Sequence, residues 1–328
     1  MSTPDHIVFA EELGYEYAFT YDSPTFLADP WITLSRAAER TSRIKIGPSV
    51  ITPELRHLVA NASAIATLHT LAPGRVEVVV GSGFTSQAML GRGPVSWGSV
   101  ERYVVALRSI LGGEDIEWEG TMVGLRYGPL SGVNFPIEIP FRVAAHGPKG
   151  YAVAERSADG MVTNLGHHTA NTGETALDHA MLLFYGTVLD EGEPLGSERV
   201  VDATGPAAAF QLHIGNEGIA PDAPEAIAYQ KHLAAVPTGS RHLEIHRGHL
   251  IEVTEAERPL ITPKLIKNAT GSGTRSEIHS ALRKIESSGA EGVLYGPMGH
   301  DINRELERFA ECAGLLSSHP GSRRFESV

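Results

Sequence analysis

Short apolar runs rich in β-branched and aromatic residues alternate along this chain with stretches whose apolar positions recur at helical spacing. The first pattern is typical of buried strands and the second of amphipathic helices. Seven runs have the length and composition of strands, and they span residues 17–21, 44–51, 76–80, 141–145, 161–163, 207–214 and 293–295. Because strands that alternate with helices form a parallel sheet covered by helices, the pattern predicts an α/β fold, with a barrel as its leading architecture.

Capping signals mark several helix boundaries. Asp29 and Pro30 form an N-cap and a first-turn proline ahead of an apolar face, and a second helix is predicted over residues 58–71. Thr274 and Glu277 have the spacing of a capping box before a helix that leads into the last predicted strand. A helix followed by a strand is the repeat expected of an α/β barrel.

The chain starts with a helical pattern. Ile7 and Leu13 belong to a predicted helix that Gly14 ends, and residues 1–6 carry no strand-like run. We therefore expect the first barrel strand to be short or missing. The strand at 17–21 would then have an unpaired edge, which a loop, a homodimer or a higher homo-oligomer would cover.

The length of 328 residues fits either two domains or one barrel with insertions. Two gaps between predicted elements exceed what a simple repeat needs, at residues 112–140 and 215–273. We interpret both gaps as insertions and predict a single domain over residues 1–328.

Acidic residues outnumber basic ones, 39 to 27, which gives a formal net charge of −12. This charge repels polyanions, so no nucleic-acid partner is expected. The one cysteine, Cys312, permits no internal disulfide, and the N-terminal residues lack the pattern of a signal peptide. No apolar run reaches the roughly 20 residues that span a bilayer. We expect a cytoplasmic protein with a small-molecule substrate and no membrane partner.

Gly81 and Gly83 follow a buried strand in the segment VEVVVGSGF, where bare backbone can approach a cofactor. The segment resembles half of a dinucleotide-binding fingerprint, but Ser86 replaces the third glycine and no acidic residue follows at a strand end about 20 residues on. We therefore interpret this segment as a plain tight turn in preference to part of a nicotinamide-binding domain. The chain also lacks a G-x-S-x-G elbow and a Walker-type loop.

His242, His246 and His249 recur at helical spacing, which invites a metal-site interpretation. Gly248 interrupts that helix and no cysteine lies nearby. We favour a surface or substrate-loop role for these histidines and predict no metal site.

Taken together, four segments resemble the bacterial-luciferase-like oxidoreductases. These are AEELGYEYAFTYD at 10–22, DPWITLSRAAERTSRIKIGPSVITPELRH at 29–57, ASAIATLHTLAPGRVEVVVGSGF at 62–84 and AAHGPKGYAVAERSADGMVTN at 144–164. The resemblance implies a TIM-type (β/α)8 barrel with either FMN or the deazaflavin coenzyme F420 as cofactor.

The stretch Gly47-Pro48-Ser49-Val50, with Pro53 and Arg56-His57 after it, is most similar to the methylenetetrahydromethanopterin reductase branch of that family. That branch uses the deazaflavin, so F420 is the expected cofactor and FMN the alternative. The resemblance also implies a non-proline cis peptide bond between Ser49 and Val50 that backs the flavin ring.

The family binds its cofactor at the carboxyl ends of the strands, as barrel enzymes do in general. Residue by residue, this implies cofactor contacts from Ser49, Val50, Gly81, Ser82, Gly83, Ala145, His146, Gly147, Pro148, Thr163 and Asn164. A helix that starts at Pro148 would offer backbone amides to a phosphate group.

The sequence departs from the family's F420-dependent glucose-6-phosphate dehydrogenases at two catalytic positions. Phe84 stands where those enzymes have a glutamate, and Ser23 where they have a histidine. Oxidation of a sugar phosphate by that acid–base pair is therefore not expected.

We predict an F420-dependent oxidoreductase that transfers a hydride between the deazaflavin C5 and a small, largely apolar organic substrate. The cofactor supplies the difficult chemistry, so the protein mainly positions the reactants. The candidate substrate contacts are the aromatic residues Tyr21, Phe84 and Trp97, and the candidate proton-exchanging groups are Asp22, His57 and His146. Core packing for the aromatic residues and surface hydrogen bonding for the others remain open at this point.

Two other functions remain open as well. One is an FMN-dependent monooxygenase, and the other is a non-catalytic flavin-binding or structural relative, which the missing first strand would suit.

Overall fold

The computed structural model describes residues 2–164, 179–215 and 218–318. Its contacts separate into two compact units, Met1–Met181 (unit 1) and Leu182–Val328 (unit 2). Each unit is described by itself below, and the single domain expected over residues 1–328 stays a prediction.

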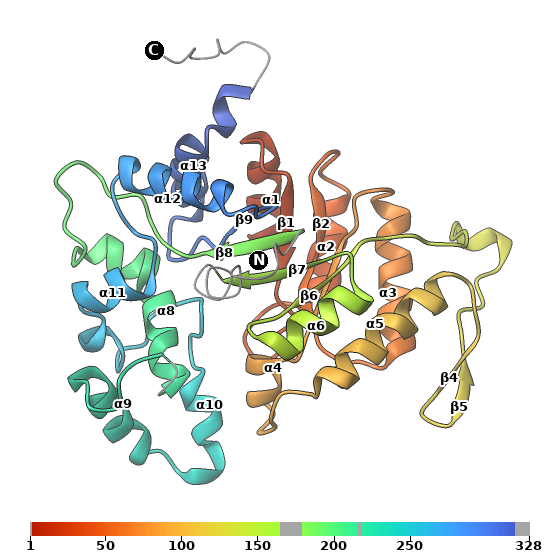
Figure 1. Cartoon of the computed structure of the whole chain (residues 1–328), viewed down its shortest axis with the longest axis horizontal. Helices are drawn as coiled ribbons and strands as arrows, with labels where there is room; N and C mark the ends of the chain where they lie inside the picture. The colour runs from red at the N-terminus through yellow and green to blue at the C-terminus, as the bar shows by residue number, and fades with distance from the viewer. Residues whose placement is uncertain (1, 165–178, 216–217, 319–328) are drawn as a thin grey trace. The chain divides into compact units, whose positions relative to one another are not determined.

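Parallel strands form the sheet of unit 1, in the order β1-β2-β3-β6-β7 (Figure 1). Their bounds are Tyr17–Thr20 for β1, Lys45–Ile51 for β2, Val78–Gly81 for β3, Phe141–Ala144 for β6 and Gly160–Asn164 for β7. All four residues of β3 are buried, as expected for a strand with neighbours on both sides and helices over the sheet. The strands predicted in this part of the sequence are thus confirmed.

Five helices of unit 1 form a layer in which successive members pack together. They are α1 (Thr3–Glu12), α2 (Pro30–Ala38), α3 (Leu58–Leu71), α5 (Trp97–Leu111) and α6 (Pro148–Ser157). The predicted caps are present, since Asp29 accepts hydrogen bonds from the first backbone amides of α2. Because α1 begins at Thr3, the prediction that residues 1–6 form no strand is confirmed for the described residues 2–6.

The predicted insertion at 112–140 lies between α5 and β6. It carries a short antiparallel hairpin of β4 (Ile116–Trp118) and β5 (Thr121–Val123), followed by the 3-10 turn η1 (Pro129–Ser131). A further short helix, α4 (Phe84–Ala88), follows β3 directly.

Unit 2 is mostly helical. Strand β8 (Ala180–Phe184) starts at the end of unit 1, and its Phe184 carbonyl accepts a hydrogen bond from Gly296, just past β9 (Gly292–Tyr295). The helices are α8 (Glu198–His213), α9 (Pro224–Ala234), α10 (Arg241–Ile245), α11 (Pro263–Ala269), α12 (Arg275–Ser287) and α13 (Ile302–Ala313), with 3-10 turns η3 (Thr238–Ser240), η4 (Arg258–Leu260) and η5 (Leu315–Ser318).

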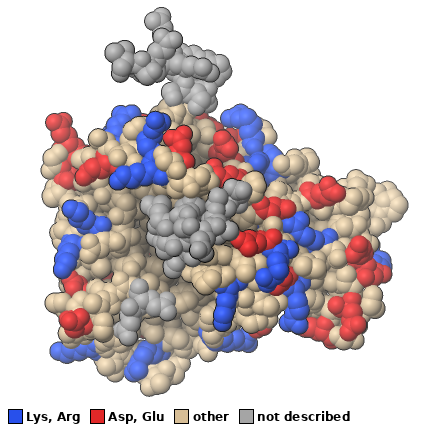
Figure 2. All heavy atoms as spheres, in the orientation of Figure 1, with Lys and Arg blue, Asp and Glu red and all other residues tan. Residues whose placement is uncertain are grey.

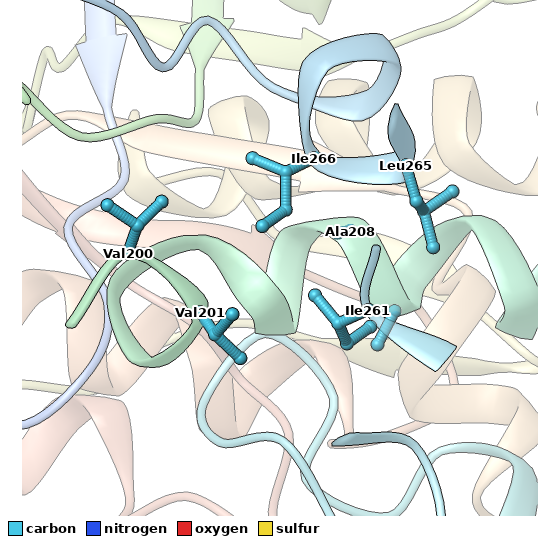
Figure 3. Close-up of a cluster of buried hydrophobic side chains, with 7 residues drawn as sticks. Val200, Val201, Ala208, Ile261, Leu265 and Ile266 are labelled. Carbon is cyan, nitrogen blue, oxygen red and sulfur yellow. The ribbon is translucent and has the colours of Figure 1, made fainter. Parts of the chain in front are cut away.

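An apolar cluster holds α8 against α11 and the segment before it. Figure 3 shows Val200, Val201 and Ala208 of α8 beside Ile261, Leu265 and Ile266. The capping box predicted from Thr274 and Glu277 is present at the start of α12.

The strand predicted at 207–214 is wrong, because these residues lie in and just after the second half of α8. Ser197 caps this helix, and the alanines at 207–209 are strong helix formers, which outweighed the apolar run that suggested a strand. Strand β8 was not predicted, because Ala180–Phe184 consists mainly of residues that also favour helices.

Acidic and basic side chains are interspersed on the face of the molecule in Figure 2. In the described part of the chain, every helix falls short of the length and apolar character that crossing a membrane would require.

Candidate functional site

The residues expected to bind the cofactor lie along one edge of the unit 1 sheet. Parallel pairing sets Ser49 of β2 opposite Val79, Gly81 of β3 opposite Ala144, and Ala144 of β6 opposite Val162. The segments that leave β2, β3, β6 and β7 therefore emerge side by side, and we call this the carboxyl edge. The peptide bond between Ser49 and Val50 is cis, as the family resemblance implied.

The two glycines after β3 are explained by close packing. A Cβ atom on Gly81 would lie 2.9 Å from a methyl group of Val50. Gly83 has a φ of +75°, and its Cβ atom would lie 2.3 Å from Thr52 Cγ2 and 2.9 Å from Ser86 Oγ. Thr52 and Ser86 themselves lie within hydrogen-bond distance, 3.2 Å apart. A side chain at Gly83 would therefore collide with the protein itself.

Helix α6 begins at the carboxyl edge, directly after β6. Its N-cap, Gly147, has an extended φ of 172°, and among the described residues other than its chain neighbours no heavy atom lies within 4 Å of the position that a Cβ atom would take. Pro148 occupies the first turn, in which backbone amides lack helical acceptors and favour an anion. Gly150 allows Trp97 to pack on this turn, because a Cβ atom there would lie 2.7 Å from the indole ring.

Asp22, one of the three candidate proton-exchanging groups, is buried just beyond β1. Arg56 donates to both of its carboxylate oxygens over long distances, 3.4 and 3.5 Å, and makes a shorter 2.7 Å ion pair with Asp29. Burial raises the pKa of Asp22, and the charge and hydrogen bonds of Arg56 only partly offset this effect. The carboxyl group therefore keeps its proton to a higher pH than an ordinary aspartate.

A second chain of hydrogen bonds connects helices α2, α3 and α5. Trp31 donates its indole N–H to Asn61, 3.2 Å away, and Asn61 donates to the hydroxyl of Tyr103 at 2.7 Å. Burial is the main cause that raises the pKa of Tyr103 to about 12, so it stays a neutral hydroxyl group. Sequence analysis missed Asn61 and Tyr103, although an asparagine between the alanines at 60 and 62 of helix 58–71 was an available signal.

The other two candidate proton-exchanging groups are exposed histidines. His57 is the N-cap of α3, and its Nδ1 accepts a hydrogen bond from the Val59 amide at 3.2 Å. His146 follows β6 at the carboxyl edge. Because Nδ1 of His57 serves as a cap acceptor, this ring contributes first to the start of α3.

Tyr21 and Phe84, the remaining substrate candidates, are 39% and 45% exposed at the ends of β1 and β3. Thr163 is buried in β7, and its hydroxyl lies 3.3 Å from that of Tyr151 in α6. Asn164 and Ser82 lie half-buried at the same edge. The aromatic rings are therefore accessible in unit 1, whereas Thr163 mainly joins β7 to α6.

Two buried polar atoms beside the carboxyl edge lack hydrogen-bond partners within the described residues, namely Thr20 Oγ1 and Gln87 Oε1. The Gln87 side chain is held in place by its amide nitrogen, which donates to the Pro53 carbonyl at 3.3 Å. A buried polar atom without a partner costs about 1–3 kcal/mol. Polar groups of a bound ligand would remove this cost, so these atoms fit a cofactor site.

The comparisons with known proteins agree with this geometry. A family model described as luciferase-like monooxygenase matches residues 2–181. The chain belongs to this family. Among curated luciferase-like relatives, it is 34% identical over 193 residues to an F420-dependent glucose-6-phosphate dehydrogenase of Beutenbergia cavernae, a match that covers 52% of this chain and 55% of the relative.

A second relative is the 5,10-methylenetetrahydromethanopterin reductase of Methanolobus tindarius, which is 28% identical over 162 residues. The match covers 48% of each chain. The chain thus spans about half the length of the curated relatives it matches.

Solved luciferase-like structures share the fold of nearly the whole chain. The coenzyme F420-dependent tetrahydromethanopterin reductase of Methanopyrus kandleri superposes with a TM-score of 0.69 at 19% identity, over 94% of this chain and 93% of its own. A second structure is the oxygenating constituent of 3,6-diketocamphane monooxygenase from Pseudomonas putida in complex with FMN. It has a TM-score of 0.57 at 14% identity, and the match covers 96% of this chain and 92% of its own. These matches confirm the predicted TIM-type (β/α)8 class.

Proposed function

We propose that this luciferase-like protein is an F420-dependent oxidoreductase that transfers a hydride between the deazaflavin C5 and a carbon of a small organic substrate. The observation that carries the proposal is the strand register that aligns the ends of β2, β3 and β6 beside the start of α6. The similarity to an F420-dependent glucose-6-phosphate dehydrogenase favours the deazaflavin over FMN.

The residues at the carboxyl edge have distinct tasks in this proposal. Val50 and Gly81, whose atoms pack closely, would form a flat apolar backing for the tricyclic ring. The first backbone amides of α6, which follow Gly147, would hold a phosphate group. Thr20 and Gln87 would supply polar contacts to the cofactor. Bound F420 supplies the hydride-accepting or hydride-donating carbon.

Asp22 is the residue that we assign to proton exchange with the substrate. A general acid works best when its pKa is near the working pH, and burial moves the pKa of Asp22 in that direction. Arg56 and Asp29 would fix the carboxyl group in position, since Arg56 donates to both carboxylates. His146 remains the second candidate for this role.

The substrate class follows from what surrounds these groups. Tyr21 and Phe84 provide exposed aromatic surface after β1 and β3, and Ser23 and Phe84 replace the acid–base pair of the sugar-phosphate dehydrogenases. We therefore propose a small carbonyl, imine or alkene substrate of low polarity.

The test starts with the full chain expressed in a host that makes both F420 and FMN. The absorbance spectrum of the purified protein identifies a retained cofactor, and titration of the cofactor-free protein gives both affinities. We expect tighter binding of F420, and oxidation of reduced F420 by at least one substrate of the proposed class. Preferred binding of FMN with oxygen uptake would instead identify a monooxygenase. Absence of binding to either would identify a non-catalytic relative.

A further inference from the structure

Three histidines converge in the interior of unit 2. His213 is the last residue of α8, and His246 and His249 lie in the turn that follows α10. They are 8%, 4% and 4% exposed, and one ring nitrogen from each lies within 4.8 Å of the other two. His246 and His249 are therefore buried and not at the surface, whereas the alternative role expected for them, in a substrate loop, stays a prediction. His213, and not His242, is the third member of the cluster.

The backbone of this turn brings the two neighbouring rings to one side. His249 donates its backbone N–H to the His246 carbonyl, and between them Gly248 has a φ of +69°. A Cβ atom on Gly248 would lie 2.6 Å from the Glu252 carbonyl oxygen, so the turn requires glycine.

The nitrogen atoms have spacings that suit a shared ion. Nδ1 of His249 lies 2.9 Å from Nδ1 of His213 and 3.5 Å from Nδ1 of His246. With Zn–N bonds of about 2.0–2.1 Å, two nitrogen ligands of a tetrahedral zinc ion lie about 3.3 Å apart. The two measured distances bracket this value.

A buried carboxylate fixes the ring of His213. Its Nε2 lies 2.5 Å from Glu257 Oε1, while the other oxygen of Glu257 accepts two hydrogen bonds from Thr254. Because an ionised carboxylate only accepts hydrogen bonds, Nε2 carries a proton, and in the neutral form of the ring the lone pair is on Nδ1. A carboxylate behind a ligating histidine is the usual outer shell of a metal site.

Aromatic packing surrounds one of the other two rings. Phe210 packs edge-on against His249 with a centroid distance of 5.2 Å. A metal ion binds the neutral form of an imidazole, through its lone pair.

One hydrogen bond can join two of the rings, if Nδ1 of His249 carries a proton and donates it to Nδ1 of His213, 2.9 Å away. The 3.5 Å separation of His249 and His246 is long for such a bond. A single cation at the centre would instead be bound by one nitrogen atom of each of the three rings.

We propose that His213, His246 and His249 bind a divalent transition-metal ion of the zinc type, with Glu257 as the outer carboxylate. The fourth position is open to water or another small ligand, as in sites with three protein ligands. The ion joins the end of α8 to the turn after α10. This site lies wholly in unit 2 and is independent of the proposed cofactor site.

The test uses the full chain without an affinity tag, stripped of metal with EDTA. Calorimetric titration with Zn²⁺ is expected to give one ion per chain, and Co²⁺ is expected to give the intense visible bands of tetrahedral coordination. Zn²⁺ should raise the midpoint of thermal unfolding, whereas Mg²⁺ should not.

Variants locate the ion. His249→Gln should abolish stoichiometric binding, and Glu257→Gln should weaken it by about 10- to 100-fold. His242→Gln removes a histidine of the same segment that lies outside the cluster, so it should bind like the unaltered protein. Equal binding by a folded His249→Gln variant would overturn the proposal. If that variant fails to fold, the Co²⁺ spectrum of the unaltered chain decides, and lack of the tetrahedral bands overturns it.

Discussion

Arg142 of β6 forms an ion pair inside unit 1 with Glu77, the residue that directly precedes β3. Their side chains are 6% and 2% exposed, and Arg142 Nε donates to Glu77 Oε1. Arg142 also donates from Nη1 to the His179 carbonyl at 2.8 Å, just before β8. One guanidinium group thus connects three strand beginnings, at the end of the sheet opposite the carboxyl edge.

Replacing Arg142 with methionine should lower the free energy of unfolding by about 3–5 kcal/mol, because it leaves the Glu77 carboxylate buried without its partner. The double variant Arg142→Met with Glu77→Leu should recover most of that loss, since no charge then remains buried. Urea unfolding of the three proteins measures both effects. If Arg142→Met were as stable as the original protein, this result would contradict the prediction that Glu77 needs Arg142 as its partner.

Asp22→Asn should lower turnover with reduced F420 by about 10²-fold or more, because an amide cannot exchange the proton that we assign to this group. The affinity for F420 should stay unchanged, and the fall in rate as the pH rises through the pKa of Asp22 should disappear. Asp115→Asn, which alters an exposed aspartate paired with Arg126, is the matched control. Full activity of the Asp22 variant would move the role to His146.

Gly83→Ala should destabilise the folded protein before any cofactor is added. The left-handed backbone costs alanine about 1–2 kcal/mol, and collision with Thr52 adds about 1–3 kcal/mol. Gly98→Ala in the first turn of α5, whose Cβ atom would meet nothing closer than 3.9 Å, should leave stability unchanged or raise it slightly. Thermal unfolding of both variants without cofactor tests this difference, and equal melting temperatures would refute it.

The ionisation of Glu193 makes the free energy of unfolding depend on pH in the acidic range. Hydrogen bonds from Arg199, opposed by burial and assisted by the Asp190 amide and Ser197, lower its pKa from 4.5 to about 2. Between these pH values the unfolded chain binds a proton that the folded chain does not, so the free energy of unfolding falls as the pH falls through this range.

In Glu193→Gln this part of the pH dependence should be lost, so the curve should be flatter than that of the original protein. Glu286→Gln, at an exposed position of α12, is the control and should keep the original slope. Chemical unfolding at a series of pH values provides the comparison. An unchanged slope in the Glu193 variant would show that Arg199 does not hold this carboxylate.

The sequence predicted those strands whose composition and flanking turns agree. The runs at 44–51 and 76–80 are rich in valine and isoleucine, and both are strands, whereas the leucines and methionine of β8 gave no such signal. The opposite error occurred at 207–214, where an apolar run is the buried face of a helix. Local composition could not distinguish these cases, because tertiary burial decides them.

The candidate sites also differ in how far the sequence could predict them. Positions at the carboxyl edge follow directly from where each strand ends, so they could be predicted one by one. By contrast, 34 residues separate Asp22 from Arg56 and 36 separate His213 from His249. Only the folded chain brings these partners together, and no spacing rule links them.

Asp29 divides two tasks between its two oxygen atoms. Oδ1 accepts hydrogen bonds from the backbone amides of Trp31 and Ile32 at the start of α2, and Oδ2 accepts a hydrogen bond from Arg56. Serine at this position would preserve the helix start but release the guanidinium group, and glutamate would retain the charge but lose the short reach that capping needs. Substitutions at this one codon are therefore constrained twice, because the side chain must both cap α2 and hold the guanidinium group of Arg56.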